Sequence, residues 1–90
     1  MAHVIVRHTV EDYGRWKSLF DADAGRRSNA GCEHEQIYRD ADDSNGITVV
    51  MQFGSQDQAH AFAADPALAE TMKQAGVVAR PEISFLNAAD

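Results

Sequence analysis

The chain has few cysteines, few prolines and few basic residues, and these shortages limit what it can be. Its single cysteine, Cys32, has no partner for an intramolecular disulfide. Eight basic residues against fourteen acidic ones give a net charge of −6, which disfavours nucleic acid and anionic membranes as partners. No apolar run is long enough for a signal peptide or a membrane span. Together these absences predict a soluble cytoplasmic protein.

Motifs that bind cofactors or metals are also missing. The sequence has no glycine-rich phosphate loop and no nucleophile elbow. Its four histidines do not recur at the spacing of metal ligands, and the acidic turn at 40–43 lacks the distal glutamate of a calcium loop. Acidic neighbours are expected to raise the pKa of the Cys32 thiol, which makes it a poor nucleophile. We therefore expect neither a cofactor nor a metal ion.

The apolar pattern predicts a single domain, residues 1–90, with the order strand, helix, strand, strand, helix, strand. The expected strands are 3–7, 33–39, 47–53 and 83–86. Asn45-Gly46 fits the hairpin turn between the second and third strands. A helix is expected from 10 to 30, with a capping box formed by Thr9 and Asp12. The second helical region begins with a capping box formed by Ser55 and Gln58 and divides at Asp65-Pro66, where Pro66 suits the first position of a helix. The spacing of Leu68, Met72 and Ala75 predicts the buried stripe of its second piece.

Strand composition predicts the order of the sheet. The first and third strands are apolar on both faces, as central strands are, whereas the second and fourth are more polar, as edges are. This pattern predicts an α+β, ferredoxin-like split βαβ fold with the antiparallel strand order 4-1-3-2 and all helices on one face. The other face would then be open in a monomer. We expect a second copy of the chain to cover it, sheet against sheet, as a homodimeric α/β barrel.

One face of the first helix combines aromatic and charged residues. At 100° per residue, Asp23 and Arg27 fall on the same face as Trp16. One interpretation is an exposed i,i+4 ion pair, worth a few tenths of a kcal/mol. The other is the polar end of a pocket between helix and sheet, in which Arg27 would clamp an anion or a carbonyl. The aromatic residues Trp16, Tyr38 and Phe53 either line such a pocket or belong to the core.

His8 is the histidine best placed for chemistry, because it ends the first strand where a pocket mouth is expected. There it could act as a general base or as a hydrogen-bond donor to a ligand. The positive end of the following helix dipole is expected to keep its imidazole neutral. The alternative is a histidine that faces solvent or caps the helix.

Three stretches of the chain resemble the dimeric α/β-barrel superfamily, which includes the antibiotic biosynthesis monooxygenases and small cyclase-like proteins. They are Val-Arg-His-Thr-Val-Glu-Asp-Tyr at 6–13 with Trp16-Lys17, Tyr-Arg-Asp-Ala-Asp-Asp at 38–43, and Ala-Phe-Ala-Ala-Asp-Pro at 61–66 with Ala75-Gly76-Val77. In such folds two sheets close face to face, and each protomer keeps a ligand cavity between its own sheet and helices. The resemblance implies that the residues lining this cavity are His8, Trp16, Asp23, Arg27, Tyr38 and Phe53.

Two functions remain open at this point. The first is a cofactor-independent enzyme, monooxygenase-like or cyclase- or isomerase-like, that acts on a small aromatic, carbonyl or polyketide-type compound. His8 would move a proton, Arg27 and Tyr38 would hold the developing oxyanion, and Trp16, Asp23 and Phe53 would contact the substrate. The second is a non-catalytic homodimeric domain that binds a small ligand or has a structural role.

Overall fold

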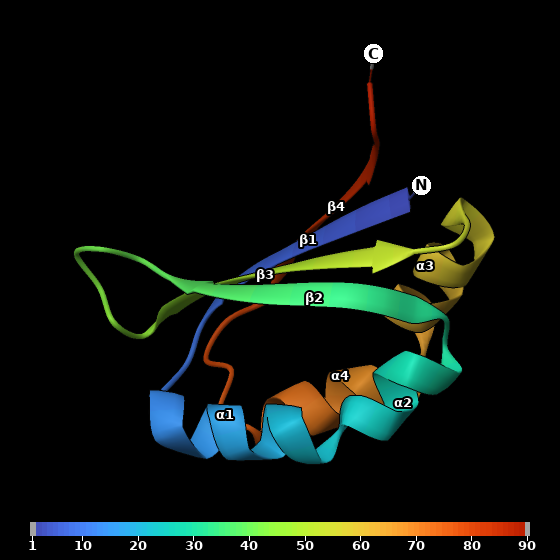
Figure 1. The fold of residues 1–90 in the computed structure, drawn as a ribbon. Helices are drawn as coiled ribbons and strands as arrows, with labels where there is room; N and C mark the ends of the chain where they lie inside the picture. Colours follow the sequence, from blue (N-terminus) through green and yellow to red (C-terminus); the bar gives the residue numbers. More distant parts are fainter. Residues whose placement is uncertain (1, 90) are drawn as a thin grey trace.

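The computed structural model describes residues 2–89, which form one four-stranded sheet and four helices (Figure 1). The elements in chain order are β1 (Ala2–Thr9), α1 (Tyr13–Ala22), α2 (Ala24–Asn29), β2 (Cys32–Arg39), β3 (Gly46–Phe53), α3 (Gln56–Ala64), α4 (Pro66–Gln74) and β4 (Glu82–Asn87). The sheet forms one layer; α1, α2 and α4 lie beneath it, and α3 lies at its right-hand end (Figure 1). The predicted α+β class is therefore confirmed.

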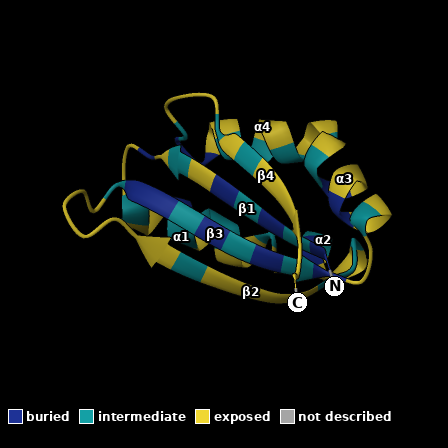
Figure 2. Ribbon diagram, turned by 90° about the horizontal axis from the view of Figure 1, so that it is seen from above, coloured by how far each residue is buried: buried dark blue, intermediate teal, exposed yellow. Residues whose placement is uncertain are grey.

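The strands are antiparallel and run across the sheet in the order β2-β3-β1-β4, which is the predicted order 4-1-3-2. The long central pairing aligns Val4 with Met51 and Val6 with Val49. Seen from above the sheet, β1 and β3 alternate between buried and partly exposed residues, whereas β2 and β4 are mostly exposed (Figure 2). The more apolar strands thus occupy the centre, as their composition predicted.

The core lies between the sheet and the helices. Alternate residues of the central strands point into it, and Val4 and Phe53 are completely buried. Their neighbours on the opposite face, such as Ile5 and Val50, are only partly buried, because no element formed by residues 2–89 covers that face. We call this uncovered side the open face of the sheet.

The first helix begins three residues later than predicted. Asp12, not Thr9, is the N-cap, and its carboxylate accepts a hydrogen bond from the backbone N–H of Arg15 at 3.2 Å. Thr9 instead ends β1, where it pairs with Gly46. The N–H of Val10 donates to Asn45 O, and this long-range hydrogen bond of 2.9 Å helps hold the segment out of the helix. The expected capping box at Thr9 and Asp12 was therefore wrong.

The predicted helix from 10 to 30 is also divided in two. Asp23 ends α1 and precedes α2, with φ −91° and ψ 8°, outside the regular helical geometry. Aspartate and the nearby Gly25 are poor helix formers, so a break costs little there. The break changes the direction of the chain before Arg27, which is decisive for the site described below.

Local sequence signals predicted the second helical region more accurately than the first. Ser55 caps α3 by accepting from the N–H of Gln58, and Asp65 caps α4 by accepting from the N–H of Ala67. Pro66 occupies the start of α4, as predicted. After α4 the chain turns through Gly76, whose φ of 85° favours glycine. These caps rely on neighbouring residues alone, which is why the sequence indicated them.

Candidate functional site

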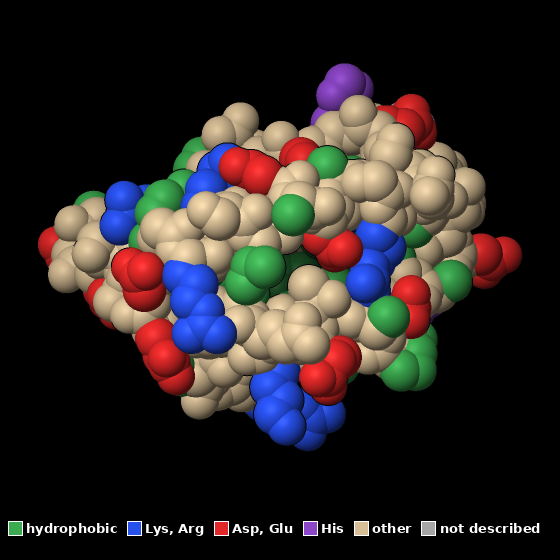
Figure 3. All heavy atoms as spheres, turned by 90° about the horizontal axis from the view of Figure 1, so that it is seen from below, with side chains coloured by type: hydrophobic (Ala, Val, Ile, Leu, Met, Phe, Trp, Pro, Cys, Tyr) green, Lys and Arg blue, Asp and Glu red, His purple; other side chains and the backbone are tan. Residues whose placement is uncertain are grey.

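A small cavity lies between the sheet and helices α1, α2, α3 and α4, and we call it the inner cavity. Its volume is about 60 Å³. Figure 3 views the helical side and shows a narrow opening with hydrophobic atoms at its bottom. Most of the lining is apolar, and the polar residues stand at its ends. The lining residues are Val6, His8, Trp16, Phe20, Asp23, Arg27, Val49, Met51, Phe62, Leu68, Thr71, Met72 and Ala75.

Aromatic side chains of α1 form one wall of the inner cavity. Trp16 is buried and stacks on Phe20, with ring centroids 4.9 Å apart. Tyr13 packs against the other side of Trp16 at 5.9 Å. This spacing of three and four residues puts all three rings on the sheet-facing side of one helix. The wall suits a flat, largely apolar ligand.

His8 stands at the β1 end of the inner cavity, where its ring meets the edge of Trp16 at 5.6 Å. Its Nδ1 is buried and has no hydrogen-bond partner among the described residues. Burial lowers the pKa of the imidazole below its ordinary 6.5, so the neutral form dominates at neutral pH. The expected cause, the dipole of the next helix, was wrong, since that helix begins only at Tyr13.

His8 also faces a second, wider space that opens at the end of the sheet, which we call the outer hollow. Its volume is about 370 Å³. It lies between the end of β1, the base of the β2–β3 hairpin and the segment before β4. Its lining comprises Arg7, His8, Thr9, Asp40, Gly46, Ile47, Ala79, Arg80 and Glu82. His8 is thus shared by the inner cavity and a solvent-accessible space.

Asp23 and Arg27 both line the inner cavity, but they do not pair with each other, contrary to the i,i+4 interpretation. Asp23 pairs with Arg26 at 3.1 Å. Arg27 instead donates from Nε and Nη2 to the carboxylate of Glu35 on β2, at 2.5 and 3.1 Å. The break at Asp23 explains the exchange of partners, because the two residues no longer share one regular helix.

Arg27 is fully engaged by the protein. Its Nη1 donates to Phe20 O at 2.7 Å, and its guanidinium lies 3.6 Å above the Phe20 ring. The residue is only 4% exposed. Each of its three guanidinium nitrogens thus donates one hydrogen bond to the protein, which leaves two of its five N–H donors. Arg27 therefore closes one end of the inner cavity, and its role as a clamp on a ligand oxygen stays a prediction.

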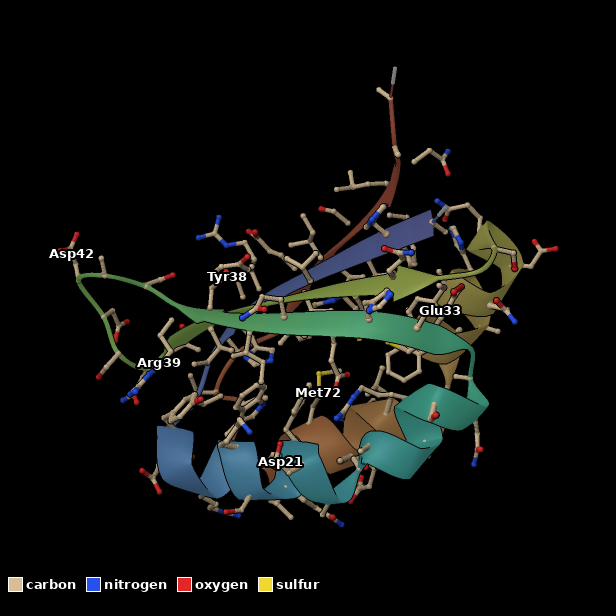
Figure 4. All side chains as sticks on the ribbon, in the orientation of Figure 1. Asp21, Glu33, Tyr38, Arg39, Asp42 and Met72 are labelled. Carbon is tan, nitrogen blue, oxygen red and sulfur yellow. The ribbon has the colours of Figure 1, made fainter. Side chains whose placement is uncertain are left out.

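Two of the predicted site residues lie away from the inner cavity. Tyr38 is 55% exposed and lies on the open face of the sheet, as Figure 4 shows. Its neighbour Arg39 points the other way and packs over Tyr13 at 3.9 Å, in agreement with strand alternation. Phe53 is completely buried and packs on Phe62, so it belongs to the core rather than to the lining.

Helix α4 supplies the wall opposite the aromatic residues. Leu68, Thr71 and Met72 line the cavity from this helix, and Figure 4 shows Met72 directed towards the sheet. None of the residues of α4 is fully buried, so this wall is loosely held by packing. The i, i+3, i+4 spacing predicted an inward stripe of Leu68, Met72 and Ala75 but gave no reason to single out Thr71.

The structure gives no sign of a metal centre. Within the part of the chain that is described, no three metal-ligating side chains gather in one place. Cys32 is half-buried, and burial, followed by the nearby charge of Glu35, raises the pKa of its thiol. The predicted direction of this pKa shift is confirmed. Among residues 2–89, no helix is long and apolar enough to cross a membrane.

The chain matches no family model and no curated protein. It is, however, similar to several solved structures. SnoaB, a cofactor-independent oxygenase from Streptomyces nogalater, is 17% identical, with a TM-score of 0.78 over 99% of this chain and 93% of that one. An antibiotic biosynthesis monooxygenase is 10% identical, with a TM-score of 0.76 over the whole of both chains. Rv0793 from Mycobacterium tuberculosis is 18% identical, with a TM-score of 0.74 over 99% and 95%.

These likenesses concern the fold, because the sequences are far apart. The chain has the ferredoxin-like α+β fold found in structures described as antibiotic biosynthesis monooxygenases. The resemblance of the sequence predicted this fold.

Proposed function

We propose that the protein is a cofactor-independent enzyme that removes a proton from a small aromatic or carbonyl compound held in the inner cavity. The observation that carries this proposal is His8, a partly buried histidine whose buried Nδ1 has no partner among the described residues and which lies at the end of an aromatic-walled cavity. Support comes from the shared fold of a protein described as a cofactor-independent oxygenase. We place the protein in the cytoplasm, as its composition predicts.

His8 serves as the general base. A neutral imidazole accepts a proton from a carbon next to a carbonyl or an aromatic ring, and it keeps this form at neutral pH because burial lowers its pKa. The outer hollow gives the imidazolium a route to solvent. Return of the proton to another atom of the ligand completes an isomerisation. In a cyclisation, the carbanion instead attacks a second carbonyl carbon of the same ligand, the C=O π bond opens, and the new alkoxide oxygen takes the proton from His8.

Dioxygen as co-reactant gives an oxygenase instead. The carbanion formed from a CH₂ group bonds to O₂, the resulting peroxide takes the proton from His8, and loss of water leaves a carbonyl. Each turnover then converts one CH₂ and one O₂ into one C=O and one water. No protein group is oxidised or consumed, because His8 returns the proton that it takes up, and the sequence has no cofactor motif.

The ligand requires more room than the inner cavity has in this structure. Pockets for drug-sized ligands measure roughly 300–1,000 Å³, whereas this cavity measures about 60 Å³. Helix α4 is the wall that yields, because it has no fully buried residue and lines the cavity with the flexible Leu68 and Met72. Outward movement of these side chains joins the cavity to the opening seen in Figure 3.

We also propose that two copies of the chain pair through their open faces. Ile5 and Val50 are neighbours at the centre of this face, and Leu86 on β4 is 42% exposed. A second sheet would remove these side chains from water, which a chain with so thin a core needs. Tyr38 would then lie at the interface between the copies.

A second candidate function is a non-catalytic domain that binds a small ligand or has a structural role. The small size of the inner cavity favours it, since a cavity largely filled by side chains needs no substrate. The two functions differ in whether bound compound exchanges a proton with the protein.

The test is proton exchange on 2-tetralone, a bicyclic ketone with acidic C–H groups next to its carbonyl. In D₂O the wild-type protein should exchange these hydrogens faster than buffer, as mass spectrometry would measure. His8→Ala should remove this excess rate, because the base is lost. The excess rate should fall as the pH is lowered through the pKa of His8, below 6.5, where the imidazole becomes protonated. His34→Ala is the matched control, since His34 is exposed on the edge strand β2.

An oxygen electrode separates the enzymatic variants of the proposal. Exchange with consumption of O₂ means an oxygenase, and exchange without it means an isomerase or a cyclase. Binding of 2-tetralone with no excess exchange would leave the non-catalytic function. Normal exchange by His8→Ala would contradict the mechanism.

A further inference from the structure

Arg26 and Arg27 lie next to each other in sequence, at the end of the inner cavity remote from His8. They differ in how many of their guanidinium nitrogens have a hydrogen-bond acceptor. Arg27 uses all three of its guanidinium nitrogens within the protein. Arg26 uses two: Nε donates to Asp23 at 3.1 Å and Nη2 to Thr71 Oγ1 at 3.2 Å. Its Nη1 is buried and has no acceptor among the described residues. A buried N–H without an acceptor is costly, so it indicates a missing partner.

The two groups that hold Arg26 both line the inner cavity. Asp23 lies in the link between α1 and α2, and Thr71 lies on α4. Arg26 thus stands directly behind this polar end of the lining. The outward movement of α4 that admits a ligand carries Thr71 with it. Arg26 is not itself a lining residue in this structure. The movement required by the proposed function would release Nη2 next to the unpaired Nη1 and would bring both donors to the enlarged cavity.

The geometry points to Arg26 as the residue that binds the oxygen atom of the ligand, through Nη1 and Nη2. This role rests on the proposed function, since it requires an aromatic ligand in the inner cavity. It adds to the role predicted for Arg27, whose guanidinium nitrogens each have a partner within the protein. Because His8 and Arg26 lie at opposite ends of the cavity, the negative charge that develops when His8 removes a proton reaches this oxygen by delocalisation through the conjugated ring between them.

The charges around Arg26 restrict that oxygen to a neutral group. Asp23 already balances the guanidinium and lies in the lining itself. A carboxylate ligand would approach Asp23 and be repelled, whereas a hydroxyl or a carbonyl oxygen would not. The inferred ligand class is therefore an aromatic ketone or phenol, and not an aromatic acid.

The experiment compares two probes of equal shape, 2-naphthol and 2-methylnaphthalene, by equilibrium dialysis. Wild type should bind 2-naphthol at least about tenfold more tightly than 2-methylnaphthalene, because a hydrogen bond from a charged donor contributes that much binding free energy. Arg26→Met should remove this preference while leaving the affinity for 2-methylnaphthalene unchanged. Arg26→Lys keeps the charge but lacks the paired donors, so it should lose most of the preference for 2-naphthol. 2-Naphthoate should bind more weakly than 2-naphthol.

Arg15→Met is the matched control, because Arg15 also ties α4 to the first helix, through Gln74 O at 2.6 Å. Gln74 does not line the cavity, unlike Asp23 and Thr71, which hold Arg26. Arg15→Met should keep the preference for 2-naphthol. Equal loss of preference in Arg15→Met and Arg26→Met would attribute the effect to loosening of α4 and overturn the role of Arg26. An unchanged preference in Arg26→Met would overturn that role alone. If wild type bound neither neutral probe, both the role and the proposed function would fall.

Discussion

At the scale of single residues, burial acts in opposite directions on the two groups that it perturbs most clearly. It lowers the pKa of His8 and raises the pKa of Cys32, because a low-dielectric environment disfavours the charged form of each. The result is a neutral imidazole at the cavity and a protonated thiol at the edge strand. The sequence suggested both outcomes but assigned the first to a helix dipole and the second to acidic neighbours.

The ion pair between Arg27 and Glu35 is a second residue-scale feature, and it yields a stability prediction. Arg27→Met should lower the free energy of unfolding by about 2 kcal/mol, because a buried bidentate pair loses one partner. The loss stays below the largest values for buried pairs, since Glu35 remains 34% exposed and can be hydrated. Urea unfolding of variant and wild type measures the difference.

Lys17→Met is the control for this pair. Lys17 forms an exposed i,i+4 pair with Asp21, and its loss should cost less than about 0.5 kcal/mol. If Arg27→Met cost no more than Lys17→Met, the partnership with Glu35 would be unimportant for stability.

At the scale of elements, the start of α1 decides where His8 lies. Because the N–H groups of Val10 and Glu11 donate to Asn45 O of the hairpin and to Gly76 O, β1 extends to Thr9 and keeps His8 within the sheet. A helix beginning at Val10 would have placed His8 in a turn at its N-terminus. Strand geometry instead directs His8 to the same side as Val4 and Val6, towards the inner cavity.

The observed cap predicts a clear difference between two substitutions. Asp12→Ala should destabilise the protein by about 1 kcal/mol, because the N-terminal N–H groups of α1 lose their acceptor. Thr9→Val should change stability little, since Thr9 is an exposed strand residue and valine favours strands. Thermal unfolding at matched concentration compares them. The reverse ranking would restore Thr9 as the cap.

At the scale of the whole molecule, the fold leaves one side of its sheet without cover. The helices all occupy the other side, and the open face carries Ile5 and Val50 on the two central strands (Figures 1 and 2). A short chain has few other apolar surfaces on which to build a stable assembly. The open face is therefore where the proposed homodimer forms.

Sedimentation equilibrium tests this assembly. Wild type at micromolar concentration should be a dimer, with an interface above about 1,000 Å². Ile5→Glu should shift it to monomer, because two carboxylates would be buried at the centre of a symmetric interface. Ser18→Glu adds the same charge on the exposed surface of α1 and should leave the dimer intact. A monomeric wild type would contradict the proposed assembly.

The sequence by itself determined the elements and their order across the sheet. Apolar alternation marked β1 and β3 as central strands, and local caps at Ser55 and Asp65 marked α3 and α4. These features depend on residues close together in the chain, so a linear pattern contains them. The same holds for the aromatic face of α1, whose helical spacing the structure reproduces.

Only the tertiary structure decided which charged side chains meet at the inner cavity. Arg27 pairs with Glu35 on strand β2. Arg26 bonds not only to Asp23 but also to Thr71 on α4, which is 45 residues away in sequence. The position of Tyr38 on the open face likewise depended on the register of β2 against β3. Hydrogen bonds between distant segments set where α1 begins, and a break at Asp23 turned Arg27 towards the sheet, because contacts far apart in sequence outweighed local helix preference.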